Sequence, residues 1–275
     1  MKPILVMAMA EIREGLRNRW IISSIIGLGL FAFSLALLGS TPVGEIDASA
    51  LNITTISLAS LSVYLIPLIA LMLAFDAIVG EAERGTLLLL LTYPIKRWQV
   101  ITGKFLGHLI ILSIAIVIGY GLAGFYISLN HSIVSVDWVN YLNMIISTVL
   151  LGSVFLSIGY LISVVIKERS TAIGVSIATW LLLIVVYDLM LLGLVLSDEG
   201  QLINSNMLAT IIYLNPADIY RLFNLAGNES ARLISGMSDL AGTVLLQSWS
   251  MMTALILWII VPLLAAITIF HKKEI

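Results

Sequence analysis

Charged residues and cysteine are the two things this sequence has little of: 11% of its 275 residues are charged, 60% are hydrophobic, and cysteine is absent. Soluble chains average about 25% charged residues, so this composition indicates an integral membrane protein. Without cysteine the chain can form no disulfide and offers no thiolate to a metal. No basic stripe interleaved with aromatic residues is present either, so nucleic-acid binding is not predicted.

Nucleotide and metal sites are equally hard to find. Gly103-Lys104 is followed by Phe105 instead of Ser or Thr, and Trp98 stands where a phosphate-binding loop has its first glycine. The three histidines are scattered along the sequence, at His108, His131 and His271. Methionines within apolar stretches are better explained by packing than by copper binding. We therefore predict no catalytic residue, no metal site and no cofactor bound by this chain.

Six apolar stretches are long enough to cross a bilayer as helices, since one span needs about 20 residues. They comprise residues 20–38, 55–79, 105–129, 141–166, 171–196 and 246–270. Runs of this length far exceed what a barrel strand needs. The predicted fold is an all-α polytopic membrane protein, a single transmembrane domain over residues 1–275 with six transmembrane helices.

Positive charge predicts how these spans are oriented. If the amino terminus is cytoplasmic, twelve of the fourteen Lys and Arg residues fall on the inner side, and only Arg221 and Arg232 fall on the outer side. This asymmetry is the one that the positive-inside rule describes. With six spans, it places both termini in the cytoplasm.

The segment before the first span, residues 1–19, carries an apolar stripe. Its members recur at helical spacing, at Leu5, Met9, Ile12 and Leu16. This pattern predicts an amphipathic elbow helix that lies on the inner membrane face. A cytoplasmic extension of the first span is the alternative.

The longest inner loop, residues 80–104, surrounds five consecutive leucines with charge. The run from Leu87 to Leu91 is too short to cross a membrane. Glu81 and Glu83 favour a helix start before it, and Tyr93-Pro94 favours a stop. A second short helix is expected to follow. Its basic residues are available to lipid phosphates, at Lys96, Arg97 and Lys104. An exposed leucine-rich helix suits a protein groove, although the leucines could instead pack on the inner ends of the spans.

The outer segment before the sixth span, residues 197–245, predicts two or three short helices that form an external lid. Asn215-Pro216 reads as a stop followed by a proline-started helix, and Asn228 could cap another at Glu229. The segment could plug the outer mouth or could dock a soluble external partner. The candidates for partner contact are Tyr213, Asn215, Asp218, Tyr220, Arg221 and Phe223.

Two carboxylates lie in apolar surroundings. Asp76 is near the inner end of the second span, within reach of water or Arg84, and Asp188 is deeper in the fifth span beside Tyr187. Charge inside a membrane is costly enough to suggest function. A gate contact, a cargo ligand or a dimer-interface hydrogen bond is possible for Asp188, and so is plain helix packing.

The inner loop also carries a motif that resembles the signature of permeases of the type 2 ABC exporter superfamily. Its positions are Glu81, Glu83, Gly85, Thr86, Leu87, Leu90, Leu91, Pro94, Arg97, Gly103 and Lys104. More narrowly, the blocks "EIREGLRNRW", "FDAIVGEAERGTLLLLLTYPIKRWQVITGKFLGH", "VYDLMLLGL" and "LNPADIYRLFNL" resemble the permeases of the ABC complex that matures nitrous oxide reductase. Leu88 replaces an acidic residue common in the wider superfamily, which favours apolar docking.

This resemblance implies a homodimer in a bacterial cytoplasmic (inner) membrane, with two copies of a cytoplasmic ABC ATPase that holds ATP and Mg, and a periplasmic copper-handling β-helix protein. It implies a coupling helix that fits the ATPase cleft. The residues expected to carry this coupling are Glu81, Glu83, Arg84, Gly85, Thr86, Leu87, Leu88, Leu91, Pro94 and Arg97. The cargo, whether a sulfur species, copper or none, stays open.

Two other classes of function remain open from the residues alone. An ATP-independent channel or secondary transporter would usually show paired repeats, broken helices and several intramembrane ionisable groups. A membrane anchor for a periplasmic protein would tolerate change in the leucine run.

Overall fold

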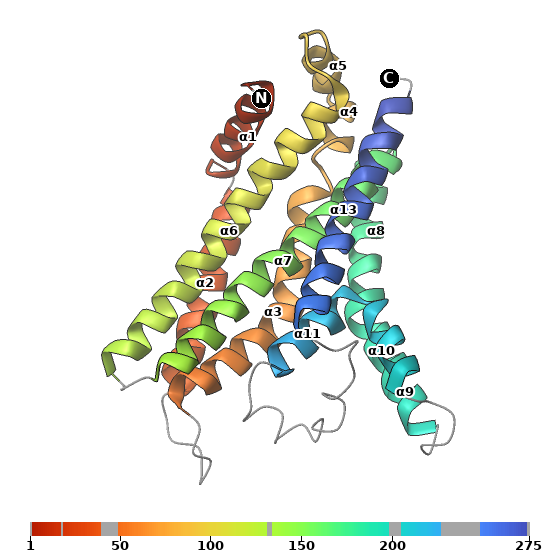
Figure 1. Ribbon diagram of the computed structural model, residues 1–275. Helices are drawn as coiled ribbons and strands as arrows, with labels where there is room; N and C mark the ends of the chain where they lie inside the picture. Colours follow the sequence, from red (N-terminus) through yellow and green to blue (C-terminus); the bar gives the residue numbers. More distant parts are fainter. Residues whose placement is uncertain are drawn as a thin grey trace.

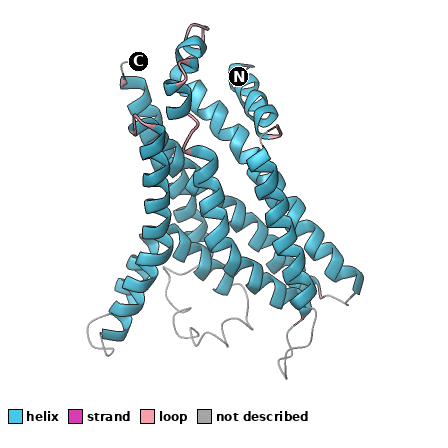
Figure 2. Ribbon diagram, turned by 180° about the vertical axis from the view of Figure 1, so that it is seen from behind, coloured by secondary structure: helices cyan, strands magenta, loops and turns pink. Residues whose placement is uncertain are grey.

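The computed structural model describes residues 2–17, 19–39, 49–130, 134–197, 205–226 and 248–273, and within these ranges the chain is helical without any strand (Figures 1 and 2). The helices are α1 (Lys2–Gly15), α2 (Arg19–Gly39), α3 (Ala50–Ala74), α4 (Val79–Glu83), α5 (Thr86–Leu91), α6 (Arg97–Asn130), α7 (Ser135–Val165), α8 (Arg169–Leu181), the π-helical turn η1 (Leu182–Val186), α9 (Tyr187–Ser197), α10 (Ser205–Tyr213), α11 (Pro216–Ala226) and α13 (Ser248–Lys272).

Five helical stretches are long and apolar enough to cross a membrane. They are Ala50–Glu83, Arg97–Asn130, Ser135–Val165, Arg169–Leu194 and Ser248–Lys272. Helix α2 contains a shorter apolar stretch, Ile26–Leu37. The predicted all-helical membrane protein is therefore confirmed, and five of the predicted spans have counterparts. The count of six stays a prediction.

Helix α7 lies at the centre of the bundle and packs against α3, α6 and α13 (Figure 1). Its buried serines bond to their own helix: the hydroxyl of Ser153 donates to Val149 O at 2.7 Å, and that of Ser157 donates to Val154 O at 2.7 Å. A buried hydroxyl without a partner is costly, and a carbonyl one turn back supplies the partner. Small polar residues can thus occupy the interior of an apolar bundle.

Helix α1 packs closely on the first turns of α6 through two glycines. A Cβ added at Gly103 would lie 2.6 Å from the Met7 Cβ, and one added at Gly107 would lie 2.5 Å from the Glu11 Cβ. Glycines four residues apart let two helices approach in this way. The opposite face of α1, including Leu5, is exposed. The predicted amino-terminal helix is present, separate from α2, and its exposed apolar face suits contact with lipid.

One predicted boundary is wrong, and one predicted span is interrupted. Helix α6 begins at Arg97, eight residues before residue 105, so the expected separate helix after Pro94 does not form. The fifth span is not continuous α-helix, because η1 divides it into α8 and α9. The charged residues in the first turns of α6 are compatible with a continuous helix because they pair with other groups of the chain.

Both described ends of the chain lie with α1, α4 and α5 at one end of the bundle, here called the terminal end (Figure 1). Helices α9, α10 and α11 lie toward the opposite end, the far end. Helix α11 turns back against α3, α7 and α13. Its start at Pro216, after α10 ends at Tyr213, confirms the predicted stop and proline start. The predicted cap at Asn228 lies outside the described residues.

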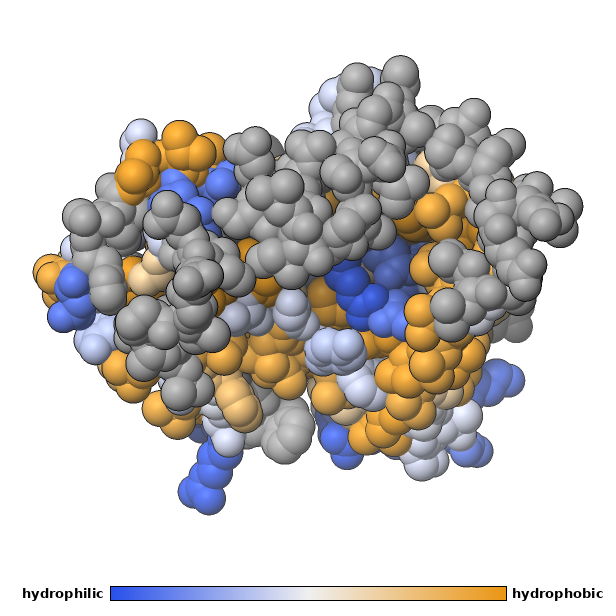
Figure 3. Space-filling model, turned by 90° about the horizontal axis from the view of Figure 1, so that it is seen from below, coloured by the Kyte–Doolittle hydropathy of each residue, from blue (hydrophilic) through white to orange (hydrophobic). Residues whose placement is uncertain are grey.

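The far end, viewed along the bundle, is hollowed. Figure 3 shows hydrophilic surface in a recess that apolar surface borders. Helix α11 buries mostly hydrophobic residues against the bundle, so it is packed into the structure rather than lying across it as a flat lid.

Candidate functional site

The predicted coupling region folds as two short helices, α4 and α5, that meet at Gly85. Gly85 has φ +72°, a left-handed conformation that glycine adopts without Cβ strain. The predicted single helix from Glu81 through the leucines is therefore wrong, because Glu81 and Glu83 belong to α4. Helix α5 runs from Thr86 to Leu91 and ends before Pro94, as the predicted stop requires.

The leucines of α5 divide into a buried and an exposed set. Leu87 is only 1% exposed and belongs to the core, whereas Leu88 is 54% and Leu89 is 67% exposed. Of the three leucines expected to carry coupling, Leu87 faces inward, Leu91 is half-buried and Leu88 is exposed, and their role in coupling stays a prediction. The outward apolar pair is Leu88 and Leu89.

Helix α4 is anchored at both ends by other helices. The hydroxyl oxygen of Ser163 on α7 accepts the backbone N–H groups of Ile78 at 2.9 Å and Val79 at 3.1 Å. The first N–H groups of a helix have no partner within it, so Ser163 satisfies two of them. At the other end of α4, a Glu83 carboxylate oxygen accepts the backbone N–H of Arg169, where α8 begins, at 2.6 Å. The coupling region is thus tied to α7 and α8.

A buried polar network, here called the terminal-end cluster, joins four helices. It comprises Glu11 on α1, Glu81 on α4, Lys104 and His108 on α6, and Tyr160 on α7. The Lys104 ammonium pairs with Glu11 and lies 2.9 Å from Glu81 Oε1. Glu11 Oε2 lies 3.2 Å from His108 Nε2, and the Tyr160 hydroxyl lies 2.7 Å from His108 Nδ1.

The position of Lys104 in the terminal-end cluster contradicts the prediction that it contacts lipid. Lys104 is 3% exposed, so it does not face lipid phosphates as predicted; a buried ammonium persists because two carboxylates flank it.

Burial alone would raise the pKa of Glu11, but the hydrogen bond from His108 and the charge of Lys104 outweigh burial and lower that pKa to about 2. Glu11 is therefore ionised at every physiological pH.

Asp76 lies beside this cluster and pairs with two arginines. Arg169 Nε is 2.8 Å from Asp76 Oδ1, and Arg84 Nη1 is 3.6 Å from Asp76 Oδ2, so the expected reach to Arg84 is confirmed. The carboxylate lies over Gly80, where an added Cβ would be 2.0 Å from Asp76 Oδ1. Asp76 lines one cavity of about 490 Å³ together with the members of the terminal-end cluster other than Tyr160.

Arg97 caps a helix instead of facing lipid. Its Nη1 donates to the carbonyl oxygens of Phe270 at 3.0 Å and His271 at 3.3 Å, and also to that of Lys273. These are the last carbonyls of α13, which lack partners within the helix and attract a cation. The expectation of lipid contact is wrong for Arg97, while Lys96 is exposed.

A second polar group, here called the far-end cluster, comprises Asp188 on α9 with Asn215, Asp218 and Arg221 at α11. Arg221 pairs with Asp188, and its Nη1 lies 3.2 Å from Asp218 Oδ1. Asn215 Nδ2 donates to Asp218 Oδ2 at 2.9 Å. Asp188 therefore has a specific charge partner, and that partner comes from the segment predicted to be outermost.

One guanidinium in this cluster serves two carboxylates. Burial raises the pKa of Asp218 to about 7; Arg221 opposes this rise, and the nearby Asp188 carboxylate adds to it. The protonation of Asp218 consequently changes near neutral pH.

The residues predicted to contact an external partner mostly face inward. Asn215, Asp218, Tyr220 and Phe223 are buried, and the Tyr220 hydroxyl lies 2.8 Å from Thr148 Oγ1 on α7. A docking role for these side chains stays a prediction, although the structure gives them a different environment from the exposed one that docking needs. The sequence does not distinguish packing against the bundle from docking of a partner, because an amphipathic helix has the same residue pattern in both cases.

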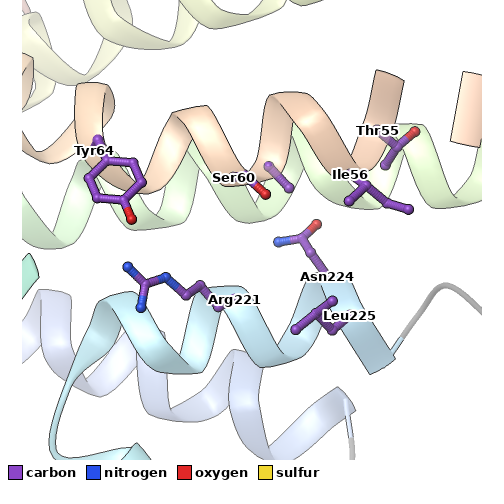
Figure 4. Close-up of a pocket in the computed structure, with 8 residues that line it drawn as sticks. Thr55, Ile56, Ser60, Tyr64, Arg221, Asn224 and Leu225 are labelled. Carbon is purple, nitrogen blue, oxygen red and sulfur yellow. The ribbon is translucent and has the colours of Figure 1, made fainter. Parts of the chain in front are cut away.

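A small cavity of about 160 Å³ separates α3 from α11 (Figure 4). Arg221 and Asn224 project toward it from α11, and Tyr64 and Ser60 line it from α3. The Arg221 guanidinium carbon is 5.8 Å from the centre of the Tyr64 ring, a distance typical of a cation–π contact. Pockets for drug-sized ligands occupy about 300–1,000 Å³, so this cavity is too small for one. Among the described residues no group of three His, Asp or Glu side chains could hold a metal ion.

The arrangement defines a helical protein with five candidate membrane spans, a supported apolar helix at one end, and a helix at the other end, α11, that packs back against the bundle. A family model described as "ABC-2 family transporter protein" matches residues 5–275. The chain therefore belongs to the ABC-2 family of transporter permeases.

Two relatives narrow this assignment. A protein named "Probable ABC transporter permease protein NosY" from Stutzerimonas stutzeri is 41% identical over 268 residues, which cover 97% of each chain. A protein of the same name from Pseudomonas aeruginosa is 37% identical over 280 aligned positions, covering 100% of both chains. The resemblance inferred from the inner-loop motif and the four blocks is confirmed.

Proposed function

We propose that this permease couples ATP hydrolysis by a partner ATPase to conformational change, in an ABC complex needed for copper-site assembly of nitrous oxide reductase. The terminal end faces the cytoplasm and receives two ATPase copies, one for each chain of a homodimer. ATP and Mg are bound by the ATPase. The far end faces the periplasm, where the change acts on a copper-handling β-helix protein or exports a sulfur species or copper.

The exposed Leu88 and Leu89 pair is the observation that carries this proposal. These side chains project from a helix whose first leucine, Leu87, is buried in the core. Gly85 sets the angle of that helix, and Ser163 holds the preceding one to α7. A solvent-facing apolar pair on so firmly held a support is well suited to an apolar cleft on a partner protein.

Charge supports the orientation. Twelve of the fourteen Lys and Arg residues belong to the inner side when the terminal end is cytoplasmic. Two acidic groups near α5, Glu83 and Asp76, are already paired within the chain. They position α5, and the leucines supply the contact.

The test is to replace both Leu88 and Leu89 with Glu and to co-express the chain with its candidate ATPase. We expect the ATPase to be lost from the purified complex, because two carboxylates would have to be buried in an apolar cleft without partners. Retention of the ATPase at the native ratio would contradict the proposal.

The matched control replaces Leu129, which is 69% exposed at the far end of α6, with Glu. We expect this chain to keep its ATPase, since it carries the same chemical change at the opposite end. An ATP-independent channel would be indifferent to the change in α5, and so would a passive membrane anchor. Maturation of nitrous oxide reductase in cells that carry each variant separates these alternatives from the proposed coupling.

A further inference from the structure

The fifth span contains a π-helical turn that accepts a hydrogen bond from another segment of the chain. Turn η1, Leu182–Val186, separates α8 from α9. Turns of this kind interrupt the regular hydrogen-bond ladder, and they bend helices and recur at functional sites. One carbonyl of the turn, Leu183 O, accepts a hydrogen bond from outside the span, from Asn215 Nδ2 at 2.8 Å.

Asn215 is fully buried and each part of its amide is used. Nδ2 also donates to Asp218 Oδ2 at 2.9 Å, and Oδ1 accepts the backbone N–H of Ala217 at 3.1 Å. The side chain is therefore the amino-terminal cap of α11 as well as the partner of η1. One residue fastens the start of α11 to the bend of the fifth span.

Two further contacts from the first turn of α9 reach the same segment. The Tyr187 hydroxyl donates to Ile211 O on α10 at 2.7 Å, and Asp188 pairs with Arg221 on α11. The α10–α11 segment is thus held at three points within a few residues of η1.

The other half of the fifth span is tied to the coupling region. Helix α8 packs against α3, α4 and α7, whereas the main neighbour of α9 is η1 itself. At the start of α8, Arg169 pairs with Asp76, and its backbone N–H donates to Glu83 on α4. The span therefore connects α4 at the terminal end with α11 at the far end, and its two halves have unequal support.

We infer that η1 is the hinge through which movement of the coupling region reaches the α10–α11 segment, and that Asn215, Asp188 and Arg221 are the positioning residues that make this segment follow the fifth span. The inference rests on the proposed function, because it takes an ATP-driven movement of α4 and α5 as its input. It assigns the far-end cluster a mechanical role and does not require a bound cargo.

The absence of cysteine lets spin labels be placed without background reaction. One pair, Met207→Cys on α10 and Leu142→Cys on α7, reports how the α10–α11 segment moves against the central helix. A second pair, Ile177→Cys on α8 and Leu106→Cys on α6, reports the input movement. All four side chains are exposed. Labelled chains are diluted into unlabelled copies in the complex with the ATPase, and electron–electron distances are measured without nucleotide and with trapped ATP.

The critical variants are Asn215→Ser and Asp188→Asn. Serine still caps α11 but is too short to reach Leu183 O, so it removes the grip and keeps the helix start. Asn130→Ser, at the exposed end of α6, is the matched control for the same substitution. If either critical variant fails to co-purify with the ATPase, Tyr187→Phe replaces it, since this change removes one hydroxyl and its bond to Ile211.

In the unmodified chain and the Asn130→Ser control, we expect ATP to shift the distances of both label pairs. In the critical variants, the shift of the α10 pair should be lost while that of the α8 pair remains. The inference is overturned if the α10 shift survives in both variants, or if α8 moves in the unmodified chain and α10 does not. If neither pair moves in the unmodified chain, the proposed function itself fails.

Discussion

Replacing Gly107 with Ala is predicted to loosen α1 from the bundle. The added Cβ would lie 2.5 Å from the Glu11 Cβ and 2.9 Å from Ala8 O. Carbon atoms in good contact are about 3.5–4.0 Å apart, so α1 has to withdraw by about 1 Å. Overpacking of this kind costs about 1–3 kcal/mol. The partner on one side is backbone, which cannot rotate away.

Helix propensity acts in the opposite direction and has to be separated from the clash. Alanine is favoured over glycine by about 1 kcal/mol within a helix. Gly121→Ala, on the exposed face of the same helix with nothing within 4 Å of the added Cβ, isolates that gain. We expect Gly107→Ala to be less stable than Gly121→Ala by the full overpacking term.

The assay is thermal unfolding in detergent, with the folded fraction measured by size-exclusion chromatography. Since 1 kcal/mol corresponds to about 2–4 °C in Tm for a domain of 150–250 residues, the two variants should differ by several degrees. Protease cleavage between α1 and α2 should also accelerate in Gly107→Ala alone. Equal melting temperatures, with cleavage unchanged, would show that α1 is not held by this close approach.

Three further predictions address charge and topology. Lys104→Met should destabilise the chain by about 3–5 kcal/mol in the same melting assay, because it leaves the buried Glu11 and the partly buried Glu81 without their shared cation; melting like the native chain would remove Lys104 from the support of the coupling region. Stability should fall as pH rises from about 4 to about 7, since folding raises the pKa of Asp218 to about 7 and the folded state holds the proton longer than the unfolded state. Asp218→Asn should flatten this part of the profile, and an unchanged slope would assign it to another group. Single cysteines at Thr92 and Met207 should react with impermeant reagents from opposite sides of the membrane, and labelling of both from one side would refute the assigned topology.

Patterns that depend on neighbours in the sequence were predictable, and partners distant in the sequence were not. Apolar runs fixed the helical class, and Asn215-Pro216 marked the true break between α10 and α11. The sequence predicts lipid contact for Lys104 because its neutralising partner Glu11 stands 93 residues away, on a different helix. Folding reversed that expectation by bringing two carboxylates to one ammonium.

The coupling region shows how a single backbone conformation alters a prediction. The charge and leucine pattern predicts one helix from Glu81 through the leucine run, and it does not separate an exposed leucine from a buried one. The left-handed Gly85 restarts the helix at Thr86, which turns Leu87 inward and Leu89 outward. Glycine at this position permits such a turn but does not require it. The π turn at η1 is harder still to anticipate, since its five residues are all leucine, isoleucine or valine and carry no signal that distinguishes them from regular helix.

The bond between Ser163 and the start of α4 has a consequence for how the protein is made. The hydroxyl that satisfies the Ile78 and Val79 amides lies 85 and 84 residues further along the chain, near the end of α7. While the ribosome is still synthesising α6, those amides have no such partner, and α4, which supports α5, is not yet held in place. The leucine pair therefore reaches its final position only after α7 has packed into the bundle. An ATPase that recognises the finished surface would join only permeases whose central helix is already in place.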